Sequence, residues 1–366
     1  MNNQVNTDLL VIGGGAAGLC AAAEAAGSGA NVMIIESDLH VGGQLVKQTH
    51  KFFGSKDEYA GTRGFKIADT LLDEINALDK KITIATNTTV TGFFPEDDVY
   101  TAMKGEEKYY RIKAKKTIIA TGAQERILPF TNNDIPGVYG AGAVQTLMNL
   151  YGVVPGDRVL MVGAGNIGLI VSYQLIQAGV DVAAVIEAMP KVGGYWVHAA
   201  KIRRLGVPIL LRHTILEATG ESTVTEAVIS EIDDKFQPVN GPKKIDCDVI
   251  CMAVGLIPTT EIFWMAGAEM RYVPQLCGYV PLRDKNMRTS NPNLWVAGDA
   301  AGIEEASAAM VEGRIAGFSA AKALGCAVDS AKLDEYWTRL AQLRAGEAGA
   351  KIRSGLSQAM VDVWRA

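Results

Sequence analysis

Two sets of glycines, each followed by a distant carboxylate, have the spacing of a dinucleotide site. In the first set, Gly13, Gly15 and Gly18 follow an apolar run, and Glu36 lies about 20 residues further on. The first glycine of such a set permits a tight turn, the second leaves room for a pyrophosphate, and the third brings a helix close to the sheet. The carboxylate accepts hydrogen bonds from a ribose. We therefore expect a nucleotide site that includes Ala16, at the start of the helix.

The second set has the same form and a similarly placed acid: Gly163, Gly165, Gly168 and Glu187. Asn166, at the start of the following helix, is expected to belong to the same site. A carboxylate at Glu187 can bind a free ribose 2′-hydroxyl but repels a 2′-phosphate, which normally requires arginine. Lys191 is the only cation that closely follows Glu187 in the sequence. The second site is therefore predicted to prefer NAD(H) to NADP(H).

Each glycine set must be positioned by a strand, a tight turn and a helix. Residues 9–12 have the pattern of a short buried strand, and an alanine-rich helix and a second strand ending at Glu36 follow. Residues 159–162 begin the second unit, which ends with a strand at Glu187. Two such units predict an α/β fold with two Rossmann-like dinucleotide-binding domains.

Other segments supply groups that suit a nucleotide. A glycine pair followed by an amide comes soon after Glu36, and two later strands end in the motifs Ala-Thr-Gly and Gly-Asp. Residues 251–260 are the second unit's counterpart of the Ala-Thr-Gly strand. The candidate residues in these segments are Gly43, Gln44, Thr121, Gly122, Gly255, Gly298 and Asp299.

Length and composition restrict the class of protein. The 366 residues allow roughly two domains. A net charge of −5 and a pI near 5.5 argue against a nucleic-acid surface. The apolar N-terminal stretch is interrupted by glycines and lacks a basic start, so it does not read as a targeting signal, and no stretch is long enough to span a membrane. We expect a cytoplasmic protein.

The cysteines and histidines show no pattern of a redox or metal site. The five cysteines form no CxxC motif, and Cys247 and Cys251, which share a face of an apparent strand, are about 13 Å apart at ~3.3 Å per residue. That separation is too long for a disulfide. We expect reduced, mostly buried cysteines. No metal site is expected, because no metal-ligand spacing occurs among His40, His50, His198 and His213.

Together these motifs resemble the flavoproteins with two dinucleotide-binding domains, of which the thioredoxin reductases are the simplest members. In that superfamily the N-terminal glycine set and its acid hold the ADP half of FAD, and the aspartate of the late Gly-Asp motif binds the ribityl chain. The resemblance implies FAD contacts at Gly13, Gly15, Gly18, Glu36, Gly43, Gln44, Gly122 and Asp299, and a backbone contact with the adenine at Val90. The reductases' redox CxxC is missing, which argues against disulfide reduction.

The order of the motifs implies a domain layout. The NAD(H) domain, residues 150–260, is expected to be inserted into a discontinuous FAD domain formed by residues 1–140 and 270–330. Residues 331–366 have the pattern of a helical tail, which could pack on the FAD domain or dock a partner subunit. Lys47 and His50, in segment 44–55, are the candidates to face the isoalloxazine, the alternative being a solvated loop.

Over roughly residues 1–325 the chain resembles the α-type subunits of multi-subunit amine and amino-acid dehydrogenases, most specifically from Ile135 to the second glycine set. This group includes dye-linked proline dehydrogenase, opine oxidase, hydrogen cyanide synthase and the heterotetrameric sarcosine oxidases. A separate flavoprotein subunit often oxidises the amine in that group. The likeness therefore implies a second flavoprotein, an iron–sulfur subunit, or both, as partners. No cysteine follows Cys326, so an iron–sulfur centre is expected on a partner or not at all.

Three functions are compatible with these observations. The first is an oxidoreductase that uses FAD and NAD(H) and serves as the electron-transferring subunit of a dehydrogenase for an amine, an amino acid or a related compound. The second is a self-sufficient flavin enzyme that acts directly on a small substrate. The third is a structural or assembly subunit with vestigial nucleotide sites. The sequence specifies neither the catalytic side chains, the substrate nor the direction of electron flow.

Overall fold

The computed structural model of the protein describes residues 4–52, 55–78, 81–106, 108–347, 349–362 and 364. Phe53 and Gly54, in the segment predicted to face the flavin, lie outside the described residues, as do four residues of the predicted tail: Ala348, Val363, Arg365 and Ala366. Two compact units make up the chain. The first joins Met1–Gln124 to Ile257–Ala366, and the second is Glu125–Leu256. Residues 125–140 thus belong to the second unit, although the sequence motifs placed them in the first domain.

The first unit is built on a seven-stranded sheet whose order is β3-β2-β1-β6-β5-β4, with β19 also paired to β6. The pairs among β1, β2, β3, β6 and β19 are parallel, whereas β4 and β5 join antiparallel. Ile12, the last residue of β1, lies opposite Ile35 and Ile119, so three strands end together. The strands are β1 (Gln4–Ile12), β2 (Val32–Ile35), β3 (Ile82–Ala85), β4 (Thr88–Phe94), β5 (Val99–Lys104), β6 (Lys108–Ile119) and β19 (Leu294–Val296).

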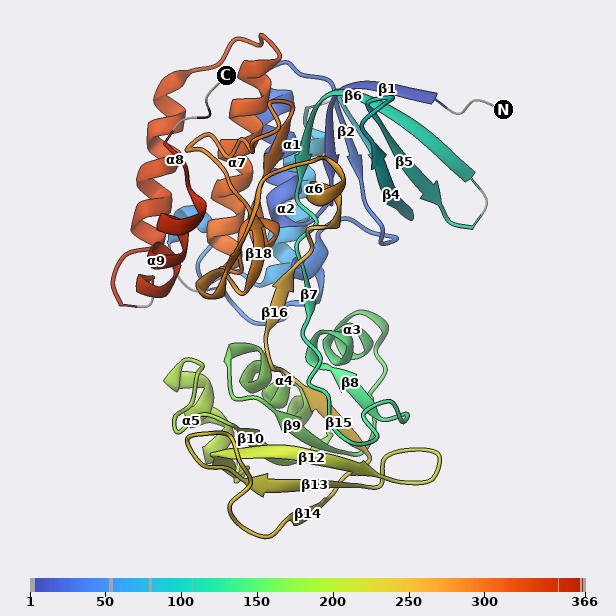
Figure 1. Cartoon of the computed structure of the whole chain (residues 1–366), viewed down its shortest axis with the longest axis vertical. Helices are drawn as coiled ribbons and strands as arrows, with labels where there is room; N and C mark the ends of the chain where they lie inside the picture. The colour runs from blue at the N-terminus through green and yellow to red at the C-terminus, as the bar shows by residue number, and fades with distance from the viewer. Residues whose placement is uncertain are drawn as a thin grey trace. The chain divides into compact units, whose positions relative to one another are not determined.

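Helices of the first unit gather on one side of this sheet, as Figure 1 shows for α1, α2, α7 and α8, while β4 and β5 extend the sheet on the other side. The helices are α1 (Ala16–Gly27), α2 (Gly64–Asn76), α6 (Glu261–Met265), α7 (Ala306–Ala323), α8 (Ser330–Leu343) and α9 (Ala350–Ala359). Short 3₁₀ helices are η1 (Gly43–Lys47), η2 (Lys56–Glu58), η3 (Pro274–Leu276) and η4 (Gly298–Ala301). A hairpin is formed by β17 (Met270–Val273) and β18 (Gly278–Pro281).

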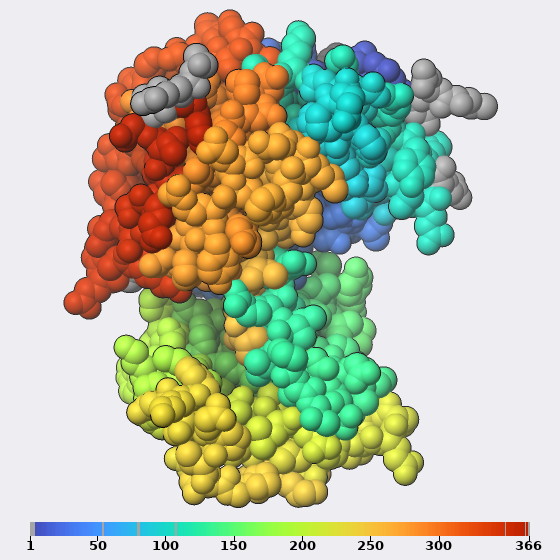
Figure 2. Space-filling model, in the orientation of Figure 1, coloured from blue at the N-terminus to red at the C-terminus, as the bar shows by residue number. Residues whose placement is uncertain are grey.

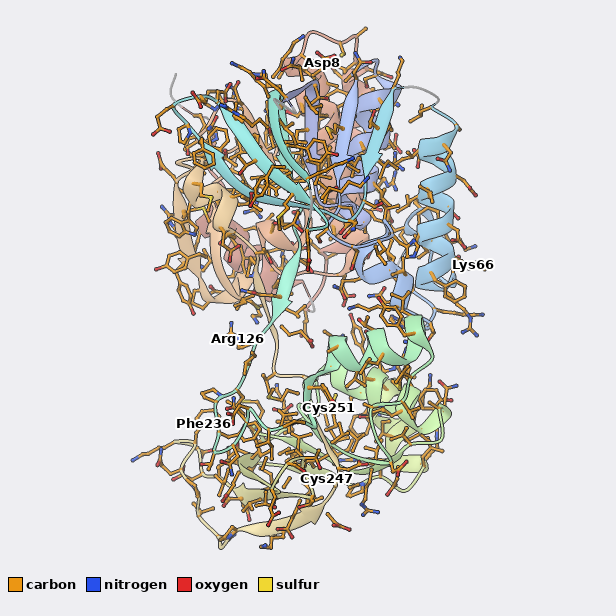
Figure 3. The ribbon with its side chains drawn as sticks, turned by 90° about the vertical axis from the view of Figure 1, so that its right-hand side faces the viewer. Asp8, Lys66, Arg126, Phe236, Cys247 and Cys251 are labelled. Carbon is orange, nitrogen blue, oxygen red and sulfur yellow. The ribbon has the colours of Figure 1, made fainter. Side chains whose placement is uncertain are left out.

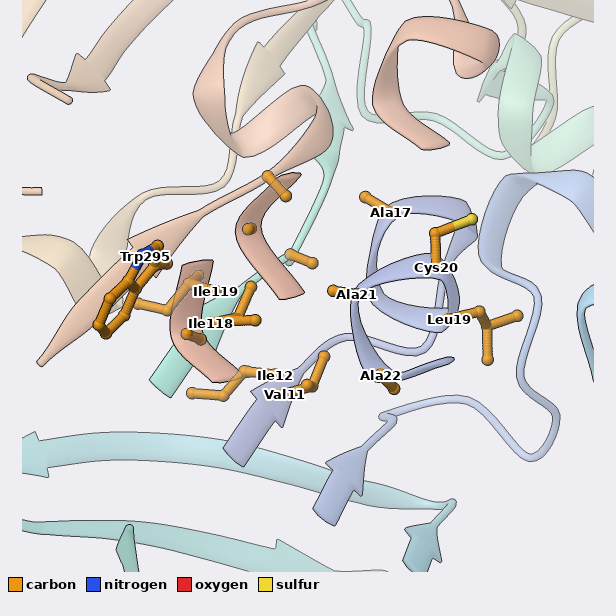
Figure 4. Packing of buried hydrophobic residues seen from close by; sticks show 14 of the residues in the cluster. Val11, Ile12, Ala17, Leu19, Cys20, Ala21, Ala22, Ile118, Ile119 and Trp295 are labelled. Carbon is orange, nitrogen blue, oxygen red and sulfur yellow. The ribbon is translucent and has the colours of Figure 1, made fainter. Parts of the chain in front are cut away.

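Small residues let α1 and α7 pack backbone against backbone. A Cβ on Gly313 would lie 2.2 Å from the carbonyl oxygen of Ala17, and one on Gly317 would lie 2.2 Å from that of Ala21. Figure 4 shows Ala21 pointing away from Leu19 and Cys20, which lie on the other side of α1. The alanine-rich sequence of α1 is therefore needed for this close packing, and a substitution at either glycine of α7 would force the helices apart.

The predicted tail packs on its own unit. Tyr336 and Leu340 of α8 are buried in the same hydrophobic cluster as α1 and α7. The hydroxyl of Tyr336 donates to the buried Glu24 carboxylate of α1 at 2.6 Å. Figure 2 shows this C-terminal segment, in red, against the orange surface of the residues that follow β16 (Leu256–Pro258). Of the two roles considered for the tail, the structure shows packing on the first unit.

The second unit repeats the parallel arrangement. Its five-stranded sheet has the order β11-β10-β9-β15-β8, and every pair is parallel. Helices α3 (Ala141–Tyr151), α4 (Asn166–Gln177) and α5 (Trp196–Arg204) cover one face, and an antiparallel sheet of β12, β13 and β14 covers the other. The strands are β8 (Val138–Gly140), β9 (Arg158–Val162), β10 (Asp181–Glu187), β11 (Ile209–Leu211), β12 (His213–Thr219), β13 (Glu226–Glu231), β14 (Lys243–Asp246) and β15 (Val249–Met252).

Two short strands carry the chain between the units, β7 (Ala123–Glu125) and β16, and these strands pair with each other. The prediction of an α/β fold with two Rossmann-like units is confirmed. Within the described residues, no helix combines the length and the apolar character needed to cross a bilayer.

One local prediction was wrong. Cys247 and Cys251 do not share a face of one strand, because β14 ends at Asp246 and β15 begins at Val249. Cys251 packs in the cluster that includes α4, whereas Cys247 packs in the cluster that includes β12 and β13 (Figure 3). The break places the two thiols on opposite faces of the sheet. All five cysteines are free thiols.

Candidate functional site

The first glycine set forms the turn from β1 into α1. Gly13 has a φ of +104°, and a Cβ there would lie 2.3 Å from the carbonyl oxygen of Ala120. A Cβ on Gly18 would lie 1.9 Å from the carbonyl oxygen of Gly13. These two glycines are therefore required by the protein's own backbone, because any side chain would separate α1 from the strand ends.

Gly15 differs from its two neighbours in the set. Its φ of −77° and ψ of −171° suit any residue, and a Cβ there would find its nearest neighbour, the Cα of Gly43, at 3.8 Å. Gly43 faces it with a φ of +52°, and a Cβ on Gly43 would lie 2.9 Å from the Cα of Gly15. The two backbones thus lie close together at the N-terminus of α1, yet a methyl group on Gly15 would meet no atom closer than 3.8 Å. No contact within the protein explains the glycine at position 15, whereas a pyrophosphate lying against the backbone would.

Glu36 holds the glycine turn from the adjacent strand. Its Oε2 accepts a hydrogen bond from the N–H of Gly14 at 2.8 Å, and its Oε1 accepts one from the N–H of Asp38 at 2.8 Å. The side chain is 7% exposed. Because an ionised carboxylate can accept about four hydrogen bonds, Glu36 can still accept from a ligand hydroxyl. Val90, on β4, lies two residues beyond Thr88, whose N–H donates to the carbonyl oxygen of Glu36 at 2.9 Å.

Three other predicted segments lie near this turn. The hydroxyl of Thr121 donates to the carbonyl oxygen of Thr259 at 2.8 Å, and Gly122, with a φ of +70°, has open space where a Cβ would stand. Gly298 begins η4, and a Cβ there would lie 2.8 Å from the Cβ of Ala17. The late Gly-Asp motif therefore packs on the first turn of α1, next to the glycine set. Gln44 is exposed, and Ala16 is the first residue of α1.

Asp299 is the one predicted residue in the first unit whose ionisation is strongly altered. Loss of solvent on burial raises the pKa of its carboxyl to about 7, and the nearby carboxylates of Glu312, Glu304 and Glu305 add to the rise. An aspartate in this state is poised to be neutral or charged near pH 7. It can therefore donate as well as accept a hydrogen bond at the site.

The second unit repeats the contacts of the first at the turn. A Cβ on Gly163 would lie 2.3 Å from the carbonyl oxygen of Ala253, and one on Gly168 would lie 2.1 Å from that of Gly163. A Cβ on Gly165 would have nothing within 4 Å. Glu187 accepts from the N–H of Ala164 at 2.8 Å, as Glu36 does from Gly14. The second turn is therefore also an open cradle, held by an acid from the next strand.

A segment that sequence reasoning missed forms a second wall of this cradle. The N–H of Gly194 donates to the carbonyl oxygen of Ala164 at 2.9 Å, and the N–H of Tyr195 donates to Oδ1 of Asn166 at 2.7 Å. Asn166 thus uses its side-chain oxygen to hold the segment before α5. The sequence signal was the glycine pair 193–194, which follows Glu187 much as the pair 42–43 follows Glu36.

The surroundings of Glu187 include a cation that the sequence does not place there. The N–H of Arg212 donates to the carbonyl oxygen of Met189 at 3.3 Å, which brings Arg212 beside the segment that follows Glu187. Its guanidinium pairs with Asp234 at 2.6 Å. Arg212 is therefore a second cationic residue whose backbone lies near Glu187, besides Lys191, and its side chain forms an exposed ion pair with Asp234. Gly255, with a φ of +113°, accepts from the N–H of Arg126 and leaves open space for a ligand.

Three of the five thiols are buried and held in the protonated form. Burial raises the pKa of Cys20 to about 11 and of Cys247 to about 12, and it also raises that of Cys251. Among the residues that the structure describes, no group of three His, Cys, Asp or Glu side chains is arranged to hold a metal ion.

The two candidates to face the isoalloxazine lie in and just after η1. Lys47 is the last residue of η1 and is half-buried. The ring of His50 stacks on that of Phe52, with 6.1 Å between the ring centroids.

The pyridine nucleotide-disulphide oxidoreductase family model matches residues 7–313, which span both glycine turns and the late Gly-Asp motif. The chain belongs to this family. The superfamily resemblance carried by the glycine sets and the later motifs is therefore confirmed.

Relatives in the family are named as parts of oxidases and of a synthase. An opine oxidase subunit from Agrobacterium tumefaciens (strain Ach5) is 27% identical over 328 residues, which are 86% of this chain and 65% of the relative. The alpha subunit of sarcosine oxidase from Corynebacterium sp. (strain P-1) is 27% identical over 336 residues, 88% of this chain and 33% of the relative. The HcnB subunit of hydrogen cyanide synthase from Pseudomonas aeruginosa is 25% identical over 372 residues, 97% of this chain and 78% of the relative. The chain thus spans less than two thirds of the first two relatives.

Solved structures show the same fold. L-proline dehydrogenase from P. horikoshii has a TM-score of 0.70 at 23% identity, with 93% of this chain and 59% of that chain covered. Thioredoxin reductase from T. acidophilum has a TM-score of 0.70 at 23% identity, with 87% of this chain and 98% of that chain covered. At these identities the likeness shows the fold alone.

Proposed function

We propose that the protein is an oxidoreductase that binds FAD in the first unit and NAD(H) in the second, and that it serves as the electron-transferring subunit of a dehydrogenase for an amine, an amino acid or a related compound. The observation that carries the proposal is the pair of open cradles. Gly15 and Gly165 adopt backbone angles open to any residue and contact nothing that demands glycine. A ligand that lies against the backbone at both helix starts accounts for the two glycines.

The flavin, when bound, supplies the hydride chemistry, and the protein supplies position and electrostatics. Glu36 would accept from the ribose of the ADP half, because its carboxylate already lies at the turn. Asp299 would meet the ribityl chain, a role that the superfamily resemblance implies. Its raised pKa allows it either to donate to or to accept from a ligand hydroxyl near pH 7.

The preference for NAD(H) over NADP(H) rests on Glu187. Its carboxylate stands at the end of β10 and would repel a 2′-phosphate while accepting from a free 2′-hydroxyl. The backbone of Arg212 lies beside the segment that follows Glu187, and its guanidinium is paired with Asp234. A redox role for the thiols of Cys20, Cys247 and Cys251 is not favoured, because burial raises the pKa of each.

The role within a larger enzyme is proposed from the relatives, three of which are named as subunits. Partners would be a second flavoprotein or an iron–sulfur protein. The alternative of a self-sufficient enzyme predicts turnover of a small substrate by the isolated chain. The alternative of an assembly role predicts bound nucleotides that no donor reduces.

Anaerobic titration of the purified protein with NADH tests the proposal. We expect FAD to be released on denaturation at about one per chain, and the flavin absorbance to be bleached by NADH. Gly165→Ala serves as the matched control, because the protein has room for its Cβ and the change lies in the second unit. That variant should stay yellow but resist bleaching at NADH concentrations that reduce the parent. A parent protein without flavin, or one that neither NADH nor NADPH reduces, would overturn the proposal.

A further inference from the structure

A buried ion cluster links the C-terminal tail to the Gly-Asp turn of the first unit. Arg344, at the end of α8, donates from Nε to Oε2 of Glu304 at 2.9 Å and from Nη2 to Oε1 of Glu312 at 2.5 Å. The side chains of these three residues are at most 9% exposed. Two carboxylates buried this deeply require a cation, since an unpaired buried charge is strongly unfavourable.

Of the two carboxylate-bearing residues, Glu312 holds the backbone before Asp299 and Glu304 contacts the side chain of Asp299. Oε2 of Glu312 accepts from the N–H of Gly298 at 3.0 Å. The N–H of Glu304 donates to Oδ1 of Asp299 at 3.4 Å. Arg344 therefore reaches the Gly-Asp turn through two separate routes, one to the residue before Asp299 and one to Asp299 itself.

Arg344 is itself held in place by the segment that follows it. A Cβ on Gly349 would lie 1.9 Å from the carbonyl oxygen of Arg344, so the chain passes close behind it. The guanidinium of Arg353, from α9, donates to the same carbonyl oxygen and, at 3.0 Å, to that of Gly346. These contacts fix the backbone at Arg344 and so limit where its guanidinium can lie. None of the dinucleotide-binding motifs of the chain requires such a C-terminal tail.

We propose that Arg344 is a positioning residue for the flavin site, which it serves by pairing with Glu304 and Glu312 so that the Gly298–Asp299 turn keeps the form that meets the cofactor. This proposal rests on the proposed function, because it takes FAD to be the ligand of the first unit. Without the Arg344 guanidinium, the buried Arg283 would remain to offset part of the charge of the two carboxylates, and they would repel each other and Asp299 more strongly. The turn would then open toward solvent, and the local potential at the flavin would become more negative.

The test compares Arg344→Gln with Arg339→Gln. Arg339 lies on the same helix and pairs with the buried Glu58, so its loss also leaves a buried carboxylate unpaired but leaves the Gly298–Asp299 turn intact. We expect R344Q to bind FAD about tenfold more weakly than R339Q, to show a shifted visible spectrum of the bound flavin, and to have a more negative midpoint potential. A double variant, Arg344→Gln with Glu312→Gln, should recover part of the loss, because the amide oxygen of Gln can still accept from Gly298 and one repelling charge is gone.

Equal FAD affinity, spectrum and potential in R344Q and R339Q would overturn the proposal. If R344Q and the double variant both fail to fold while R339Q folds, Arg344 acts in folding and the positioning role is likewise refuted. A parent protein that binds no FAD would instead refute the proposed function. That result is obtained first, from the unsubstituted chain, and so is distinguished from failure of the role assigned to Arg344.

Discussion

Replacing Gly15 by alanine tests whether this glycine is required for binding FAD or for the stability of the fold. The backbone at this position has the angles of ordinary extended chain, and the added methyl group would find its nearest neighbour at 3.8 Å. Alanine should therefore fit without strain. It also reduces the freedom of the unfolded chain, which stabilises a protein by about 0.4–1 kcal/mol where the backbone permits. Because alanine is a poorer N-cap than glycine, this gain is offset at the start of α1, and the FAD-free variant should unfold at about the same temperature as the FAD-free parent.

Binding, in contrast, should weaken. The methyl group would stand at the N-terminus of α1, where a pyrophosphate would have to approach the backbone N–H groups of the helix. We expect at least about a 100-fold loss of FAD affinity, equivalent to about 2.8 kcal/mol. Equilibrium dialysis of the FAD-free proteins gives the affinity, and thermal denaturation without FAD gives the stability. Stability must be compared without ligand, because bound FAD raises the apparent stability by mass action.

Gly18→Ala is the matched control, since it adds the same methyl group three residues away. There the Cβ would lie 1.9 Å from the carbonyl oxygen of Gly13, so α1 must shift and the FAD-free protein should lose about 3 kcal/mol or more. The reasoning is refuted if Gly15→Ala keeps the parent's affinity for FAD. It is equally refuted if Gly15→Ala destabilises the FAD-free protein as much as Gly18→Ala does.

Three further predictions concern charge and exposure. Glu187→Ala should lower the apparent affinity for NADH about tenfold and reduce the preference over NADPH, as measured by stopped-flow reduction of the flavin; unchanged preference would contradict the role of Glu187. Because burial holds the carboxyl pKa of Asp299 at about 7 rather than 3.8, the FAD-free protein loses stability as the pH rises between these values. Asp299→Asn should therefore be more stable than the parent by about 1–3 kcal/mol at pH 8, with most of the gain absent at pH 5, in urea titrations at both pH values; a gain independent of pH would contradict it. Native protein treated with iodoacetamide should be labelled only at Cys277 and Cys326, and mass spectrometry that finds Cys20 modified would contradict the burial.

The parts of the site that could be predicted are local in the chain. Gly13 and Gly18 are required by contacts with the strand and helix that they join, and Glu36 reaches back to Gly14 from the adjacent strand. Such contacts recur wherever a strand, a glycine turn and a helix follow one another, so spacing alone indicates them. The parallel strand order follows from the same units.

Other parts depend on contacts that spacing does not encode. The ion cluster of Arg344, Glu304 and Glu312 joins the end of α8 to α7 and to the loop that precedes α7, and each residue alone reads as an exposed charge on a helix or loop. The break between β14 and β15 was missed because residues 245–253 are apolar enough to read as one strand. In both cases tertiary packing, rather than local preference, decides the outcome.

The two units share both the cradle and a glycine that stands against it. In the first unit Gly43 faces Gly15 with a positive φ, and a 3₁₀ helix of five residues follows. In the second unit Gly194 takes the corresponding place, since a Cβ on it would lie 2.8 Å from the carbonyl carbon of Gly165, and α5 of nine residues follows. Both cradles therefore suit a pyrophosphate, which FAD and NAD(H) have in common. The choice between the two dinucleotides must depend on residues outside the cradles, and the buried Asp299 of the first unit is the candidate that the structure offers.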